Sequence, residues 1–139
     1  MRTFLILGAL AIGAALPTAA PAATSSSWSD QANKVCVVWL AKAKKEFGSP
    51  VTAAQLYGFA VKAKTLEAQE LAVLRQIPGA TPAGRRALAA MQADVNEVGS
   101  AITAWKAGDA AKFVKILKAY LNDSRAKTAF AAAGATKCG

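Results

Sequence analysis

The sequence predicts an all-α fold, an antiparallel up-and-down bundle of four helices, and three observations support this class. Alanine dominates the 139-residue chain, and β-branched residues form few clusters. Large apolar residues recur at helical spacing. The segments with this spacing are separated by short connections rich in Gly, Pro and Ser, and short connections make consecutive helices antiparallel neighbours.

The clearest helical pattern covers residues 81–108. Thr81 suits an N-cap, Pro82 suits the first turn, and Gly108 suits the exit. Apolar side chains recur every three or four residues, which places one buried stripe along the helix. These residues are Leu88, Met91, Val95, Val98, Ile102 and Trp105.

Two further helices precede this segment. The first is predicted over Asp30–Phe47, with Ser27 or Ser29 as its N-cap. The second is predicted over Ala53–Ile77 behind a capping box formed by Thr52 and Gln55. Glycines 58 and 99 fall at nearly matching levels of the second and third helices, where we expect a close approach of the two backbones. The alternative is a bend with a small cavity.

The last helix follows an N-cap at Asp109 and contains an interruption. Residues 122–124, Asn-Asp-Ser, favour caps and turns, and helix-forming residues resume over 125–133. We therefore expect the fourth helix to bend at Asn122–Ser124.

The N-terminal segment, residues 1–22, has the layout of a secretory signal peptide. Arg2 precedes a 13-residue apolar run over 4–16, and small residues follow Pro17. Cleavage after Ala20, Ala22 or Ala23 would leave a flexible lead-in over 23–29 and a helical domain over 30–139 of a secreted or extracytoplasmic protein. The alternative is an uncleaved membrane anchor, although the run is shorter than the roughly 20 residues of a typical span.

Cys36 and Cys138 are the only cysteines, and export favours a single disulfide between them over two buried thiols. Counting levels along the bundle places Cys36 opposite Leu121 rather than Cys138. The disulfide therefore requires either the bend at 122–124 or a tail that folds back along the first helix. In the chain-entropy model, such a closure contributes about 4–5 kcal/mol.

The chain has no histidine, which excludes imidazole bases and histidine-ligated metals, and no metal or cofactor is expected. Glu70 lies within the apolar arc of the second helix and is predicted to be a buried polar residue near the N-terminus of the first helix. Glu67 and Asp94 are expected to face each other, with a Lys62–Asp94 salt bridge favoured over a catalytic pair.

Two groups of lysines form basic stripes in this chain of net charge +9. Lys42, Lys44 and Lys45 lie at the end of the first helix, and Lys112, Lys115 and Lys118 lie along the fourth. These candidate surfaces would attract anionic lipid or wall polymer, and the alternative is an ordinary solvated face. Specific binding of nucleic acid is not expected, since aromatic residues do not alternate with the lysines.

Three short motifs resemble those of a loosely defined group of small exported helical proteins and lipoproteins of actinobacterial type. The motifs are Ala32-Asn33-Lys34-Val35-Cys36, Ala107-Gly108-Asp109, and the ending Gly134-Ala135-Thr136-Lys137-Cys138-Gly139. The resemblance implies a helical bundle with paired cysteines. It implies no activity, and the lipoprotein cysteine of many members is missing here.

The sequence therefore favours an exported, monomeric, non-catalytic helical bundle with a binding or structural role at the cell envelope. The first alternative is a basic module that associates peripherally with anionic membrane or wall polymer. The second is an enzyme that uses the carboxylates of Glu67, Glu70 and Asp94.

Overall fold

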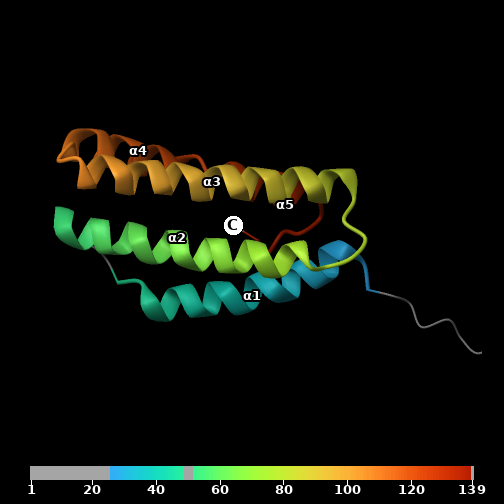
Figure 1. Ribbon diagram of the computed structural model, residues 1–139. Coiled ribbons are helices and arrows are strands. Elements are labelled where there is room, and N and C mark those ends of the chain that lie inside the picture. Colours follow the sequence, from blue (N-terminus) through green and yellow to red (C-terminus); the bar gives the residue numbers. More distant parts are fainter. Residues whose placement is uncertain (1–25, 49–51, 139) are drawn as a thin grey trace, which may run out of the picture.

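The computed structural model describes residues 26–48 and 52–138, and this part of the chain contains helices and no strand. The helices are α1 (Trp28–Glu46), α2 (Ala53–Arg75), α3 (Pro82–Lys106), α4 (Ala110–Asn122) and α5 (Arg125–Ala132). They form an elongated bundle in which α4 and α5 run back along α3, as Figure 1 shows. The predicted all-α bundle with an interrupted last helix is confirmed. The predicted signal peptide lies outside the described residues.

The helix ends follow the capping signals in the sequence. Ser27 and Asp30 form a capping box at the start of α1, and Thr52 and Gln55 form another at α2. Thr81 accepts a hydrogen bond from the Gly84 amide at the start of α3. In the described part, no helix is long and apolar enough to cross a bilayer.

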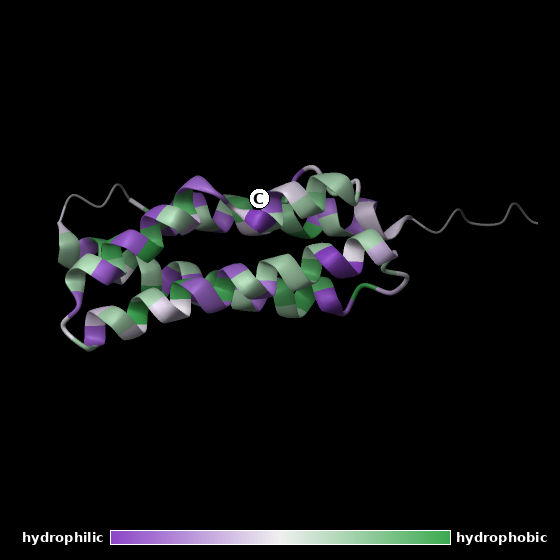
Figure 2. Cartoon of the chain, turned by 90° about the horizontal axis from the view of Figure 1, so that it is seen from above, coloured by the Kyte–Doolittle hydropathy of each residue, from purple (hydrophilic) through white to green (hydrophobic). Residues whose placement is uncertain are grey.

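The central helix is α3, which packs extensively against α2, α4 and α5. By contrast, α1 packs extensively only against α2 and lies along the outer edge of the bundle in Figure 1. Hydrophilic and hydrophobic residues alternate along the helices, as expected when each helix buries one face (Figure 2).

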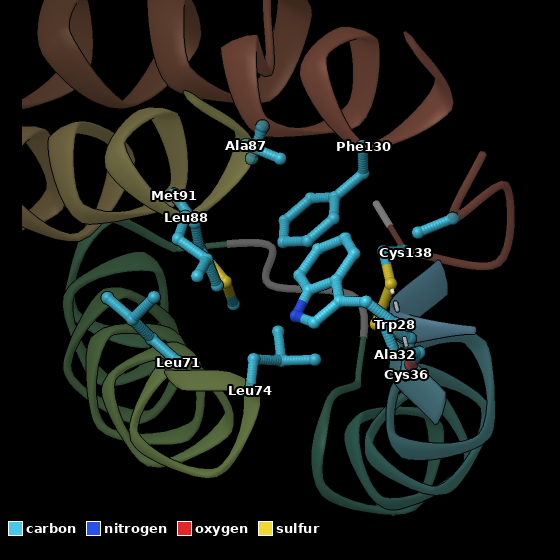
Figure 3. Close-up of a cluster of buried hydrophobic side chains, with 12 residues drawn as sticks. Trp28, Ala32, Cys36, Leu71, Leu74, Ala87, Leu88, Met91, Phe130 and Cys138 are labelled. Atoms are coloured by element: carbon cyan, nitrogen blue, oxygen red, sulfur yellow. Dashed lines mark hydrogen bonds between the residues drawn. A yellow bond between two sulfur atoms is a disulfide. The ribbon is translucent and has the colours of Figure 1, made fainter. Parts of the chain in front are cut away.

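The core has two parts, one toward each end of the bundle. The first brings α1, α2, α3, α5 and the C-terminal tail together around the aromatic side chains of Trp28 and Phe130 (Figure 3). The second joins α2, α3 and α4 around Phe113 and Leu117. All five helices therefore contribute to the buried interior.

The prediction of a flexible lead-in through residue 29 is wrong at Trp28. This residue opens α1, is only 5% exposed, and stacks on Phe130 with ring centroids 6.3 Å apart. Its ring also packs on Gly84 at the start of α3. Burial of this large aromatic surface explains why the helix begins two residues earlier than predicted.

The disulfide between Cys36 and Cys138 is confirmed, with a Cα–Cα distance of 5.0 Å and a sequence separation of 102 residues. The helix breaks between α4 and α5, and Gly134 with φ 81° then reverses the chain after α5. The tail runs along α1, where Asn33 Oδ1 accepts a hydrogen bond of 2.8 Å from the Lys137 amide. Both expected routes to the bond are therefore used.

The close backbone approach expected at Gly58 and Gly99 is wrong. A Cβ at Gly58 would meet no atom within 4 Å, and one at Gly99 would meet only the flexible Lys64 side chain. The close contact is at Gly84 instead, where a Cβ would lie 3.0 Å from the Trp28 ring. The glycine that permits tight packing is therefore the one beneath the tryptophan.

The contrast between these glycines gives a test of the packing. Gly84→Ala should destabilise the fold by about 1–3 kcal/mol, because the buried Trp28 ring has no room to move. Gly58→Ala should instead stabilise it by about 0.5–1 kcal/mol, since alanine favours the helix and meets open space. Urea unfolding of the two variants measures both changes, and equal effects at the two sites would contradict this account of Trp28.

Candidate functional site

A cavity of about 160 Å³ lies between α1, α2 and α4, and we call it the α1 groove. It exists because α1 packs extensively on α2 alone, which leaves the side toward α4 incompletely filled. Its lining is mostly apolar. The lining residues are Cys36, Trp39, Leu40, Ala43, Phe47, Phe59, Ala63, Leu66, Glu67, Glu70, Tyr120 and Lys137.

The register of α1 on α2 determines which residues meet in the groove. Phe47, just past the end of α1, contacts Phe59, with ring centroids 4.8 Å apart. The end of α1 therefore lies beside the second turn of α2, and α1 stops short of the start of α2 in Figure 1. This offset leaves a second hollow of about 310 Å³ beside Gly58, bordered by Phe47 and Phe59.

Three carboxyl groups converge at the inner end of the groove. Glu67 and Glu70 line both the groove and a smaller adjoining cavity of about 80 Å³, and Asp94 of α3 lines the latter. We call these three residues the acidic cluster. Glu67 and Asp94 are close enough for their charges to interact across the α2–α3 pair.

Asp94, on α3, caps the start of α5. Its side chain is 3% exposed, and its Oδ2 accepts hydrogen bonds from the Ala126 amide at 3.1 Å and the Ser124 hydroxyl at 3.3 Å. A carboxylate is favoured at a helix N-terminus, where backbone amides have no partner within the helix. The expected Lys62–Asp94 salt bridge is wrong, because Asp94 points toward α5 while Lys62 is exposed beside the hollow at Gly58.

Glu67 is half-buried and only partly satisfied in hydrogen bonding. It accepts a hydrogen bond from the Tyr120 hydroxyl, while its buried Oε2 has no hydrogen-bond partner among the described residues. Burial raises the pKa of Glu67 to about 7, the Tyr120 hydrogen bond opposes the rise, and the Asp94 charge adds to it. Burial, followed by the charge of Glu67, also raises the pKa of the Tyr120 phenol. The cluster therefore disfavours negative charge.

Glu70 lies about two turns from its expected place at the N-terminus of α1. Ser27 and Asp30 cap that end, whereas Glu70 borders the groove with Cys36 and Trp39. The difference arises because α1 is offset along α2 relative to the expected register. Burial, then the neighbouring Glu67 charge, raises the pKa of Glu70 to about 7. Two adjacent carboxyl groups therefore retain protons up to near-neutral pH.

The predicted basic residues remain on the surface as two separate groups. Lys44 and Lys45 are exposed in the last turn of α1, and Lys42 lies 4.6 Å from the Trp39 ring centroid. Lys112, Lys115 and Lys118 are exposed along α4. Since α1 and α4 make no extensive contact, the structure does not join the two stripes into one surface.

The hydrogen bonds of Tyr120 and Ser124 to the acidic cluster were not predicted from the sequence. A signal existed for Tyr120, because its phenol falls on the apolar face of the fourth helix and a buried phenol needs a partner.

Within the described residues, no group of three or more His, Cys, Asp or Glu side chains could hold a metal ion.

Comparison with known protein families, characterised proteins and solved structures found no match for this chain.

Removal of the Asp94 side chain tests its role at α5. Asp94→Ala should destabilise the protein by about 2 kcal/mol, because the buried Ala126 amide loses its acceptor. Asp94→Asn should cost less, because an amide oxygen still accepts. The measurement is urea unfolding at about pH 5, where Glu67 and Glu70 are protonated and do not gain from removal of a nearby charge. Glu97→Gln, which breaks the exposed Arg125–Glu97 ion pair, is the control and should change stability little. An equal loss of stability in Asp94→Ala and Glu97→Gln would contradict the capping role of Asp94.

The raised pKa values of Glu67 and Glu70 predict that the protein is most stable in mild acid. Below about pH 4.5 these carboxyls are protonated in both folded and unfolded chains, so they impose no penalty. Between about 4.5 and 7 the unfolded chain ionises first and stability falls, reaching a constant penalty above about 7. The penalty is at most about 3 kcal/mol for each group. Thermal unfolding against pH measures it, and the double variant Glu67→Gln, Glu70→Gln should flatten the curve. A curve unchanged in that variant would assign the pH dependence to other groups.

Proposed function

We propose that this chain is an exported, non-catalytic binding protein of the cell envelope, and that it holds a small amine with an apolar body in the α1 groove. The observation that carries the proposal is Glu67. Its Oε2 is a buried acceptor without a hydrogen-bond partner, in the wall of a cavity that is otherwise mainly apolar. A buried acceptor of this kind favours a ligand that brings a donor.

The size and lining of the groove indicate the body of the ligand. Its volume of about 160 Å³ matches the cavities of about 150 Å³ that accept a benzene ring. Trp39, Phe47 and Phe59 supply aromatic surface, and Leu66 supplies aliphatic surface. A single six-membered ring or a short branched chain therefore fits this space.

The acidic end of the groove indicates the head group. An ammonium next to Glu67 and Glu70 would stabilise their ionised forms and donate to the unpaired oxygen. A carboxylate ligand would face two groups that already resist negative charge. The two carboxyls therefore favour a cation at this end of the groove, on a protein whose net charge of +9 would otherwise favour anions. The exposed Lys137 also borders the groove, so the ammonium is expected beside Glu67 and Glu70.

The groove supports binding better than catalysis. Cys36 is the one cysteine in its lining, and its sulfur is bonded to Cys138 and is not a free thiol. The chain contains no histidine. The deeper cavity, where all three carboxyls meet, measures about 80 Å³ and is too small for a substrate of ring size.

Three matched probes test the proposal: benzylamine, benzyl alcohol and benzoate. Benzylamine should bind with a Kd of about 1 mM or tighter at neutral pH, a modest efficiency for eight heavy atoms. Benzyl alcohol should bind more weakly and benzoate least. Calorimetry in buffers of different ionisation enthalpy should also show proton release from the carboxyls when the amine binds.

The matched variants separate the groove from the protein surface. Glu67→Gln with Glu70→Gln should weaken benzylamine binding at least about tenfold, equivalent to about 1.4 kcal/mol. The surface variant Glu97→Gln should leave it unchanged. Preference for benzoate, or equal amine binding in both variants, would refute the proposed site.

A further inference from the structure

The outer face of α1 carries exposed hydrophobic side chains in an unusual concentration. Val37 is 52% exposed, Val38 is 66% exposed and Leu40 is 49% exposed. These are three of the six large hydrophobic residues that are exposed in the described part, and they lie within four consecutive positions. Leu40 also lines the α1 groove, so Val37 and Val38 form the outer face itself. Single exposed hydrophobics need no explanation, but a local group of them indicates an interaction surface.

The described part of the chain does not cover this face. Ala32 and Cys36 occupy the opposite side of α1 and pack into the core. Val37 and Val38 follow Cys36 at rotations of about 100° and 200° along the helix, so they point away from that side. Figure 1 places α1 at the outer edge of the bundle, which agrees with the exposure of Val37 and Val38.

The same helix is basic around these residues. Between Lys34 and Lys45 it carries four lysines and no acidic residue, and all four lysines are exposed. Asp30 is engaged in the capping box with Ser27, and Glu46 follows only at the last residue. Apolar side chains set among lysines on one helix are typical of a helix that lies in a membrane interface.

We propose that the outer face of α1 docks on an anionic lipid bilayer. Val37 and Val38 enter the headgroup region, and Lys34, Lys42, Lys44 and Lys45 contact lipid phosphates. Of the two basic faces predicted from the sequence, this surface includes only the one on α1. It is distinct from the α1 groove, which lies on the other side of α1.

Charge and hydrophobicity together select the lipid surface over other occupants. A second copy of the chain would bring two sets of lysines face to face, and their repulsion opposes a symmetric dimer. A water-soluble polyanion would match the lysines but would leave the valines in water. An anionic bilayer satisfies both kinds of side chain.

Vesicles of equal parts phosphatidylglycerol and phosphatidylcholine provide the test, with pure phosphatidylcholine as the neutral comparison. The protein is purified as its host exports it and its N-terminus is determined, since an uncleaved apolar run over 4–16 would itself bind lipid. We expect cosedimentation with anionic vesicles in low salt, and at least about a tenfold loss of binding at about 0.5 M salt. No binding to anionic vesicles in low salt would overturn the proposal, and so would equal binding to neutral ones.

Two triple variants with the same change of charge locate the surface. Replacing Lys34, Lys44 and Lys45 by Gln should weaken binding to anionic vesicles at least about tenfold. Replacing Lys112, Lys115 and Lys118 of α4 by Gln should weaken it less than about threefold, as a general charge effect. An equal loss in the two variants would show that net charge alone is responsible and would overturn the docking face.

A third variant tests the hydrophobic part. Replacing Val37 and Val38 by Ser should weaken vesicle binding at least about fivefold, because apolar area no longer enters the interface. It should leave binding to soluble heparin unchanged. Unchanged vesicle binding would overturn the role of the valines. A wild-type dimer in solution that this variant dissociates would identify a second copy as the occupant instead.

Discussion

The Cys36–Cys138 disulfide is the constraint on which the rest of the arrangement depends. It joins the chain end to the middle of α1, so the last helix cannot run straight to the end of the bundle. The chain breaks between α4 and α5 and reverses at Gly134, where φ is 81° and glycine is favoured. With 102 residues between the two cysteines, the bond removes considerable entropy from the unfolded chain.

The break between α4 and α5, one of the two features that bring Cys138 to Cys36, also explains the acidic cluster. The new helix start at α5 leaves backbone amides to be satisfied, and Asp94 satisfies the amide of Ala126 from the neighbouring helix. The negative charge of Asp94 then lies near Glu67, whose environment already opposes ionisation. The capping of α5 by Asp94 thus adds to the raised pKa of Glu67 at the floor of the α1 groove.

The attachment of α1 differs from that of the other helices, and both proposed surfaces lie on it. The helix packs extensively on α2 alone, while the disulfide, the Asn33 contacts with the tail and the stacking of Trp28 on Phe130 fix its first half. Its second half has no covalent tie, and the second hollow lies there, beside Phe47 and Phe59. The two faces of one helix therefore offer different chemistry, an acidic apolar groove inside and a basic apolar surface outside.

Helix number, capping residues, the bend at 122–124 and the cysteine pairing all follow from the sequence, because they depend on local spacing and backbone chemistry. The offset between α1 and α2 does not, because it depends on where Trp28 and Phe47 find aromatic partners that are distant in sequence. That offset places Glu70 away from the α1 N-terminus and leaves the hollow beside Gly58. The hydrogen-bond partners of Asp94 do not follow from the sequence either, because the orientation of a side chain on α3 toward α5 depends on tertiary packing. Local patterns determined the elements of this protein, and long-range packing decided how its carboxyls, its cavity and its exposed valines are placed.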